Sequence, residues 1–177
     1  MTQQFYRAAI GAFIINEHNE ILITLNYGND SKWNFPKGGI RAGESDEQAL
    51  KRELQEELGI KDFKMLAKSK ISVIYRLPEE YIKQEKLNYI GQAQRYYWLF
   101  LSKNTKLNVP NDEVEKYKWI KINSKEITIY FKAHDDEKIL QTYVPIEFEE
   151  IQLLINHNPR TILYKYDILT SERQNIR

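Results

Sequence analysis

The stretch of this chain that decides its fold runs from Gly38 to Ile60 and reads GGIRAGESDEQALKRELQEELGI. Ser45 and Gln48 have the spacing of a capping box, in which each side chain binds the backbone N–H of the other residue. Acidic residues fill the first helical turn, and Gly59 is the residue type that most often ends a helix. The stretch therefore predicts a glycine-rich loop followed by a capped helix over Ser45–Leu58.

The charges of this helix are concentrated on one side. Residues three and four positions apart share a helix face, so Glu53, Glu56 and Glu57 fall within an arc of roughly 100°. The adjoining arc is apolar and is expected to pack on a core; it consists of Leu50, Leu54 and Leu58. Ala49 falls within the acidic arc, where its small side chain is expected to leave space for a ligand.

Clustered carboxylates of this kind have two interpretations. They repel one another, and a divalent cation would turn that repulsion into binding, with oxygen ligands that suit Mg²⁺ or Mn²⁺. Alternatively, the arc is a solvated acidic surface with Lys51 and Arg52 as its ion-pair partners. The helix alone does not decide between the two.

The rest of the chain has the patterns of several strands and one further helix. Runs rich in β-branched and aromatic residues predict strands, the first two forming a hairpin; they are Ala8–Asn16, Glu20–Leu25, Phe63–Leu77, Ile90–Leu101 and Val114–Ile122. Pro78–Leu87 is predicted as a loop or a short helix, and a C-terminal helix is predicted to begin close to Pro145. We therefore expect one mixed α/β domain over residues 1–170, followed by a polar tail at 171–177.

Composition narrows the classes of function. The 177 residues include 26 Lys and Arg, 25 Asp and Glu and no Cys, for a formal net charge of +1. Without cysteine the chain has no disulfide, no thiolate metal site and no cysteine nucleophile. Because no apolar run approaches the ~20 residues that span a bilayer, we expect a cytoplasmic protein with no membrane partner, and the sequence implies no obligate protein partner.

Read from Gly38, the sequence gives a glycine, five residues, Glu44, seven residues, and then RELQEELGI from Arg52 to Ile60. This resembles the Nudix box, G-x5-E-x7-R-E-U-x-E-E-x-G-U with U a bulky apolar residue, over its full length and without a gap. Since each fixed residue type makes up about 5–10% of proteins, seven coincidences have a probability on the order of one in 10⁸ per start position. The resemblance favours the metal site over the solvated surface.

Similarity to the Nudix family implies an α+β fold in which a mixed β-sheet is sandwiched between α-helices, an α/β/α arrangement. In that family the helix glutamates bind divalent metal, and the substrate is a nucleoside diphosphate linked to another group. By position, the implied metal ligands are Glu53, Glu56, Glu57 and the backbone carbonyl of Lys37. The implied catalytic residues are Arg52, which would orient a box glutamate, Glu44 near the helix start, and Glu53, one of the glutamates that could deprotonate the attacking water.

A second set of short motifs lies outside the box. The motifs are Tyr6-Arg7, Trp33–Gly39, Tyr75-Arg76-Leu77-Pro78 and Gly91-Gln92-Ala93-Gln94-Arg95. In this order they resemble the branch that contains bacterial RNA pyrophosphohydrolases and dinucleoside polyphosphate hydrolases, over roughly Phe5 to Trp119. One departure is Leu25-Asn26-Tyr27, because the branch usually carries an arginine there that would contact phosphate.

The branch implies residues that bind the phosphate chain or support the catalytic loop: Arg7, Gln92, Gln94 and Arg95. Because a strand alternates its faces, Gln92 and Gln94 are expected on one side of the sheet and Arg95 on the other, so one of the set could be structural. Arg7 could equally be a surface arginine at the start of a strand.

Two further residues follow from the same branch. An acidic residue before the last strand would complete the metal site, with Glu113 the better match and Glu115 its competitor. Phe131 matches an aromatic residue that stacks on the terminal base of the substrate. A single phenylalanine is also a common core residue, so both interpretations of Phe131 stay open.

The expected activity is hydrolysis of a phosphoanhydride in a 5′-triphosphorylated RNA end or a dinucleoside polyphosphate, by water activated at Mg²⁺ or Mn²⁺. One alternative is a Nudix hydrolase of a nucleoside triphosphate or ADP-ribose, which the motifs at residues 75–78 and 91–95 argue against. The other is a catalytically silent module that binds nucleotide or RNA, which the complete set of box glutamates disfavours.

Overall fold

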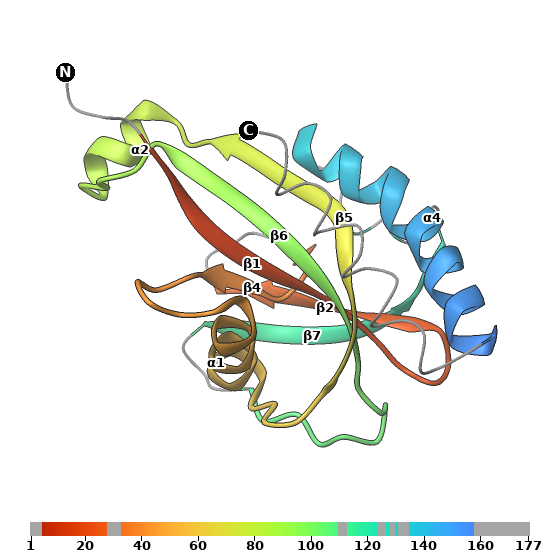
Figure 1. Ribbon diagram of the computed structural model, residues 1–177. Coiled ribbons are helices and arrows are strands. Elements are labelled where there is room, and N and C mark those ends of the chain that lie inside the picture. The colour runs from red at the N-terminus through yellow and green to blue at the C-terminus, as the bar shows by residue number, and fades with distance from the viewer. Residues whose placement is uncertain are drawn as a thin grey trace.

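One mixed β-sheet and the helices around it form the computed structural model (Figure 1), which describes residues 5–27, 33–109, 113–123, 127, 130 and 135–157. In chain order the elements are β1 (Tyr6–Ile15), β2 (Glu20–Asn26), β3 (Trp33–Asn34), β4 (Lys37–Gly39), α1 (Asp46–Leu58), β5 (Lys64–Arg76), α2 (Glu79–Gln84), β6 (Gly91–Phe100), β7 (Val114–Lys121) and α4 (Asp135–His157). Within these ranges no helix has the length and apolar character needed to cross a membrane.

The sheet opens between its first two strands. β1 and β2 pair beside the hairpin, where Ile15 lies opposite Ile21. Farther along, β1 pairs with β4 through Ala9–Gly11, while β2 pairs with β3 on one edge and with β7 on the other. β6 runs parallel to β1 along its whole length, and β5 is antiparallel to β6. The short segment that carries β3 and β4 therefore lies where β1 and β2 diverge.

Alternate residues of β1 point into two separate cores. Phe13 and Ile15 pack with Val144, Phe148 and other residues of α4 on one face of the sheet. The residues that alternate with them pack with α1 on the opposite face; on β1 these are Ile10, Ala12 and Ile14. Because a strand points successive side chains to opposite faces, α1 and α4 cover different sides of one sheet (Figure 1). The expected α/β/α arrangement is confirmed.

Most predicted elements are confirmed with boundaries that shift by a residue or two. The Ser45 hydroxyl accepts a hydrogen bond from the Gln48 N–H, and both halves of the capping box are present. Gly59 ends α1 with φ of +66°, and a Cβ atom there would lie 2.6 Å from the carbonyl oxygen of Asn108. In two segments the structure adds detail to the prediction. Two short strands, β3 and β4, flank Phe35-Pro36, and the Pro78–Leu87 segment, predicted as a loop or a short helix, contains the helix α2.

The predicted start of the C-terminal helix is wrong. α4 begins at Asp135, so Pro145 lies inside the helix and not in its first turn. A proline in a helix interior removes a backbone hydrogen bond, and here apolar residues on either side compensate. Val144, Phe148 and Ile151 recur at helical spacing and are buried against the sheet, which holds the helix in place across the proline. The strand character noted from Arg160 onward and the predicted polar tail at 171–177 lie outside the described residues.

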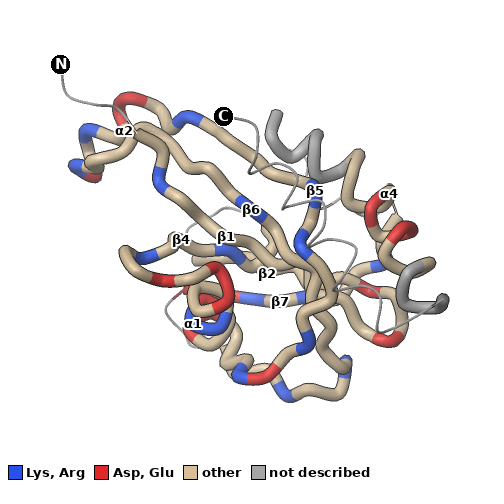
Figure 2. Tube along the Cα trace, in the orientation of Figure 1, with Lys and Arg blue, Asp and Glu red and all other residues tan. Residues whose placement is uncertain are grey.

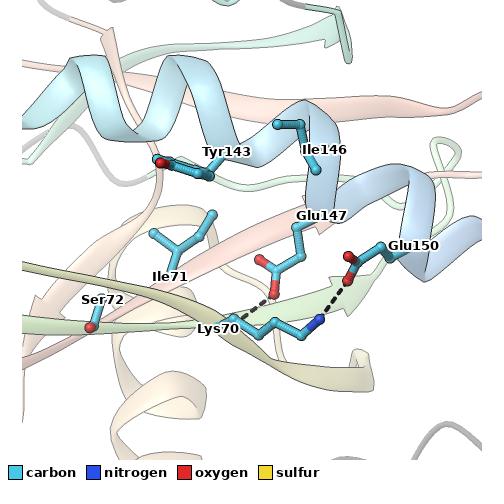
Figure 3. A pocket seen from close by; sticks show the side chains of 7 residues that line it. All are labelled: Lys70, Ile71, Ser72, Tyr143, Ile146, Glu147 and Glu150. Carbon is cyan, nitrogen blue, oxygen red and sulfur yellow. Dashed lines mark hydrogen bonds and ion pairs between the residues drawn. The ribbon is translucent and has the colours of Figure 1, made fainter.

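A buried carboxylate fastens α4 to β5. Glu147 accepts hydrogen bonds from the Ser69 hydroxyl and from the backbone N–H of Lys70, at a point where the pairing of β5 with β6 is irregular. Beside this contact, the exposed Lys70 ammonium pairs with Glu150 at 2.7 Å. A pocket of about 310 Å³ opens here between the strand and the helix (Figure 3). It lies across the sheet from α1, so it is separate from the acidic helix.

Replacing Glu147 with alanine should destabilise the protein by about 1–3 kcal/mol, because the Ser69 hydroxyl and the Lys70 N–H lose their buried acceptor. The neighbouring exposed Glu149→Ala is the matched control and should change the free energy of unfolding little. Urea denaturation of both variants measures the difference. Equal stabilities would show that the Glu147 contact does not hold α4 on the sheet.

Candidate active site

Helix α1 presents its glutamates beside strand β4. Its apolar side is buried in the core through Leu50, Leu54 and Leu58, as predicted. Ala49 does not leave space for a ligand, because it is fully buried in the same core. The three glutamates differ in exposure: Glu57 is 4% exposed as a residue, whereas the side chains of Glu53 and Glu56 are 13% and 42% exposed.

Arg52 connects the loop, the strand and the helix through one guanidinium group. It donates to both carboxylate oxygens of Glu44, at 2.6 and 2.8 Å, and to the carbonyl oxygen of Gly39 at 2.8 Å. Its Nη1 atom contacts Glu53 at 2.6 Å and Glu56 at 3.0 Å. Figure 2 shows acidic and basic residues close together along α1 and the loop before it. Arg52 therefore fixes two box glutamates relative to the glycine-rich loop.

Glu44 and Arg52 stabilise each other as charged groups. Hydrogen bonds from the Arg52 side chain and from the Arg41 backbone lower the pKa of Glu44 to about 2. The same contact with Glu44 is the largest of the effects that raise the pKa of Arg52 above its usual range. Both groups are therefore ionised at neutral pH, which keeps the bidentate pair intact.

Glu57 is in a different state from its neighbours. The backbone N–H of Lys37 donates to its carboxylate, but its buried Oε2 atom has no hydrogen-bond partner among the described residues. Burial first, and then the charges of Glu53 and Glu113, raise the pKa of Glu57 to about 8. An unpartnered buried oxygen that two other carboxylates repel is an environment that a cation would stabilise.

Of the two acids considered before β7, Glu113 is the one whose charge raises the pKa of Glu57. Its charge acts on Glu57, and its carbonyl oxygen accepts the Tyr27 N–H at 3.1 Å. Glu115 instead pairs with Lys116 at 2.7 Å. This geometry supports Glu113 as the additional acidic residue of the site.

The residues fit a hard divalent cation in chemistry, although they are not arranged as a closed site. In the described part of the chain no three His, Asp or Glu side chains converge on one point. Glu53 and Glu56 are held by Arg52, while the Glu57 oxygen is free of hydrogen bonds from the described residues. The donors are all oxygen atoms, as Mg²⁺ and Mn²⁺ prefer. Glu57 is therefore the residue around which such an ion would be held.

Strand β4 lets two charged groups approach its backbone from opposite faces. A Cβ atom on Gly38 would lie 1.9 Å from Cδ of Glu53, and one on Gly39 would lie 1.9 Å from Nη2 of Arg7. Glycine is therefore required at both positions for these contacts. Arg7 and the α1 glutamates meet at β4 although they come from different sides of the sheet.

A row of polar side chains extends from Arg7 across the sheet. Arg7 lies opposite Gln92 on β6, and Gln92 lies opposite Tyr75 on β5. Gln94 is buried one pair farther along; it accepts the Tyr96 hydroxyl at 2.7 Å and donates to Gln92 at 3.1 Å. Arg7 and Gln92 are thus neighbours on one face of the sheet, and the buried Gln94 holds Gln92 through a hydrogen bond.

Arg95 does not join this row. As expected from strand alternation it lies on the other face of the sheet, where it forms an ion pair with Asp46 at 2.7 Å. Asp46 is one of the acidic residues of the first helical turn, where the sequence predicts only a favourable charge and not this ion pair. The sequence holds one signal for this pair. Strand alternation places Arg95 on the sheet face away from Gln92, and an amphipathic helix with an acidic first turn has to pack on one of the two faces. The candidate Phe131 lies outside the described residues.

The raised pKa of Glu57 predicts a pH-dependent stability. Between about pH 4.5 and 8 the unfolded chain loses the Glu57 proton while the folded protein keeps it, so this group's contribution to folding falls as pH rises. In metal-free protein, Glu57→Gln should therefore gain stability relative to wild type by up to ~1.4 kcal/mol per pH unit across that window.

Urea denaturation of both proteins at several pH values measures this difference, with the exposed Glu47→Gln as the control. Excess Mg²⁺ at pH 8 should stabilise wild type more than Glu57→Gln. A stability difference that stays constant from pH 5 to pH 8 would contradict the burial of an uncompensated carboxyl at Glu57.

Comparison with known proteins agrees with this geometry. The Nudix domain matches residues 5–143. The chain is 32% identical over 150 residues to the RNA pyrophosphohydrolase of Blochmanniella pennsylvanica. This alignment covers 80% of the chain and 94% of the relative. It is 35% identical over 149 residues to the RNA pyrophosphohydrolase of Proteus mirabilis, with 80% and 84% covered.

Solved structures share the fold at lower identity. The chain matches a C. elegans Ap4A hydrolase with a TM-score of 0.60 at 17% identity, covering 80% of this chain and 97% of that one. It matches the E. coli dihydroneopterin triphosphate pyrophosphohydrolase with a TM-score of 0.60 at 16% identity, covering 80% and 98%. Since the Nudix domain match spans most of the sequence and includes the complete box, the chain belongs to the Nudix hydrolase family.

Proposed function

We propose that the chain is a metal-dependent pyrophosphohydrolase that cleaves a phosphoanhydride bond in a 5′-triphosphorylated RNA end or in a dinucleoside polyphosphate, with Mg²⁺ or Mn²⁺ as its cofactor. The curated relatives that carry the name RNA pyrophosphohydrolase cover 80% of this chain at 32–35% identity. The cytoplasmic location expected from the sequence stays a prediction.

One observation carries the proposal: the buried Glu57 carboxylate accepts the Lys37 N–H of β4 while its Oε2 atom has no hydrogen-bond partner among the described residues, and the Arg7 guanidinium lies against Gly39 of the same strand. A polyphosphate needs both counter-charges. A divalent cation held by the carboxylates would neutralise charge on the phosphate oxygens, and an arginine would bind such oxygens directly. The short strand between the two groups is the point where a phosphate chain would meet both.

Different residues of the chain have different proposed roles in the reaction. We assign Glu53 the role of taking the proton from the attacking water, because Arg52 holds its carboxylate in place and Gly38 leaves room beside it. Glu44 fixes the Arg52 guanidinium through two hydrogen bonds and so acts one step removed from the reaction. Arg7 and Gln92 would orient the phosphate chain.

In the reaction, water adds to a phosphorus atom and the P–O bond to the leaving phosphate breaks, so that the leaving phosphate keeps the bonding electrons. When bound, the divalent cation supplies Lewis acidity for the water and neutralises charge on the phosphate oxygens. The residues proposed to hold it are Glu53, Glu56, Glu57, Glu113 and the backbone carbonyl of Lys37. Glu57 would have to release its proton first, since its pKa lies near 8 in the absence of metal.

Hydrolysis of a nucleoside triphosphate or of ADP-ribose is the alternative within the same family. The row of Arg7, Gln92 and Tyr75 favours the first proposal, because these residues belong to the motifs that resemble the RNA and dinucleotide branch. A silent binding module is less well supported, since every glutamate of the box is present.

The decisive experiment is product analysis with purified protein and Mg²⁺ or Mn²⁺ on a panel of substrates: triphosphorylated RNA, diadenosine tetraphosphate, nucleoside triphosphates and ADP-ribose. We expect pyrophosphate from the RNA, or ATP and AMP from the dinucleotide. Preferential turnover of mononucleotides or ADP-ribose would replace the proposal with its alternative, and ligand binding without turnover would support a silent module.

In the same assay Glu56→Gln should reduce hydrolysis by at least ~10–100-fold without unfolding the protein, because a proposed metal ligand is lost while its exposed position tolerates the change. The control is Glu47→Gln, an exposed glutamate of the same helix that pairs with Lys51. Full activity of Glu56→Gln would rule out Glu56 as a metal ligand.

A further inference from the structure

Two hydrogen bonds join the first residue of α1 to the middle of β6. Asp46 accepts the Tyr97 hydroxyl on Oδ2 at 2.6 Å and the Arg95 guanidinium on Oδ1 at 2.7 Å. Arg95 and Tyr97 are two residues apart on one strand and therefore point to the same face. We call these three side chains the Asp46 clamp.

The clamp is partly sheltered from water. Tyr97 is 9% exposed, whereas the side chains of Asp46 and Arg95 are 25% and 45% exposed. Burial and the adjacent carboxylate both raise the pKa of Tyr97, so its hydroxyl remains a hydrogen-bond donor at any physiological pH. The Tyr97 contact thus holds Asp46 from the buried side, while Arg95 holds it from the solvent side.

The clamp is a directional contact between the first turn of α1 and β6. The capping box of Ser45 with Gln48 is internal to the helix and its loop, and the Arg52 bond to the Gly39 carbonyl joins a later turn of α1 to β4. The leucines of α1 pack on the sheet through apolar contacts, which are non-directional and tolerate small shifts. The contact between Glu53 and Gly38 tolerates very little, because even one added carbon atom would overlap the carboxylate.

We propose that the Asp46 clamp sets the position of α1 on the sheet, and that Arg95 is thereby a positioning residue for hydrolysis and not a phosphate contact. This rests on the proposed hydrolase function, because its main readout is turnover. A misplacement of about 1 Å in a catalytic group can cost on the order of 100-fold in rate, so a partial loosening of the helix should be measurable as a slower chemical step.

The geometry separates this role from direct binding. Arg95 lies on the α1 face of the sheet, whereas Gln92 and Gln94 lie on the other face and Gln92 lies opposite Arg7. If Arg95 acts through α1, its effect depends on Asp46. If it contacts phosphate, its effect is independent of Asp46 and appears in substrate binding.

The test is a double-mutant cycle of Asp46→Asn and Arg95→Gln, with kcat and KM measured on the best substrate of the panel. We expect each single variant to lower kcat by about tenfold with KM nearly unchanged, and the double variant to be no slower than the slower single one. Tyr97→Phe should lower kcat in the same way, while Arg95→Lys, which keeps a cation beside Asp46, should retain most of it.

Matched controls separate the clamp from general charge effects. Glu47→Gln removes an acidic side chain from the same first helical turn, and Lys83→Gln removes an exposed positive charge from α2. Both should behave as wild type. Higher KM for Arg95→Gln alone, multiplying with the effect of Asp46→Asn, would overturn the proposal in favour of a phosphate contact, and unchanged kinetics in both variants would overturn it as well.

A second readout does not depend on turnover. Hydrogen–deuterium exchange at the amides of α1 should be faster in Asp46→Asn and Arg95→Gln than in the Glu47→Gln control. If the wild-type protein hydrolyses nothing in the panel, the proposed function fails, and exchange then decides the clamp by itself. Unchanged exchange in both variants would overturn the clamp even where the hydrolase function holds.

Discussion

Strand β4 is only three residues long, and the site depends on two of them being glycines. The Glu53 carboxylate occupies the space that a side chain at Gly38 would fill, and the Arg7 guanidinium occupies the corresponding space at Gly39. The Gly39 carbonyl oxygen also accepts from Arg52, so the backbone of the strand contacts two arginines and, through Gly38, one glutamate. Any residue other than glycine would separate the acidic helix from the arginine that lies across the sheet.

The electrostatics of the site follow from how Arg52 is shared. One guanidinium stabilises Glu44, Glu53 and Glu56, and this leaves Glu57 as the box glutamate that no arginine of the described residues pairs with. Glu57 consequently has a raised pKa while Glu44 has a lowered one, although both are glutamates of one motif. The whole chain carries +1, yet this local imbalance has the charges that the proposed cation and phosphate positions would need.

The sequence predicted what short-range chemistry determines. The capped helix, its leucine face and the alternation of Gln92 and Arg95 all follow from residue spacing, and the structure agrees. The errors concern long-range packing. Pro145 lies inside α4 because Val144 and Phe148 anchor the helix on both sides of it. Ala49 lies in the core beside Leu50 and Leu54, so the buried face of α1 extends beyond its leucines. The partner of Arg95 could not be read from β6 alone, since Asp46 is supplied by a helix 49 residues earlier.

The most direct test of this account is a titration of Mn²⁺ followed by electron paramagnetic resonance, without substrate, on the wild type and on Gly38→Ala. The added methyl group must displace the Glu53 carboxylate from β4. We expect Mn²⁺ to bind the wild type and to bind Gly38→Ala at least ~10-fold more weakly, with both proteins folded by circular dichroism. Equal Mn²⁺ affinity in the two proteins would contradict the dependence of the proposed cation site on Gly38.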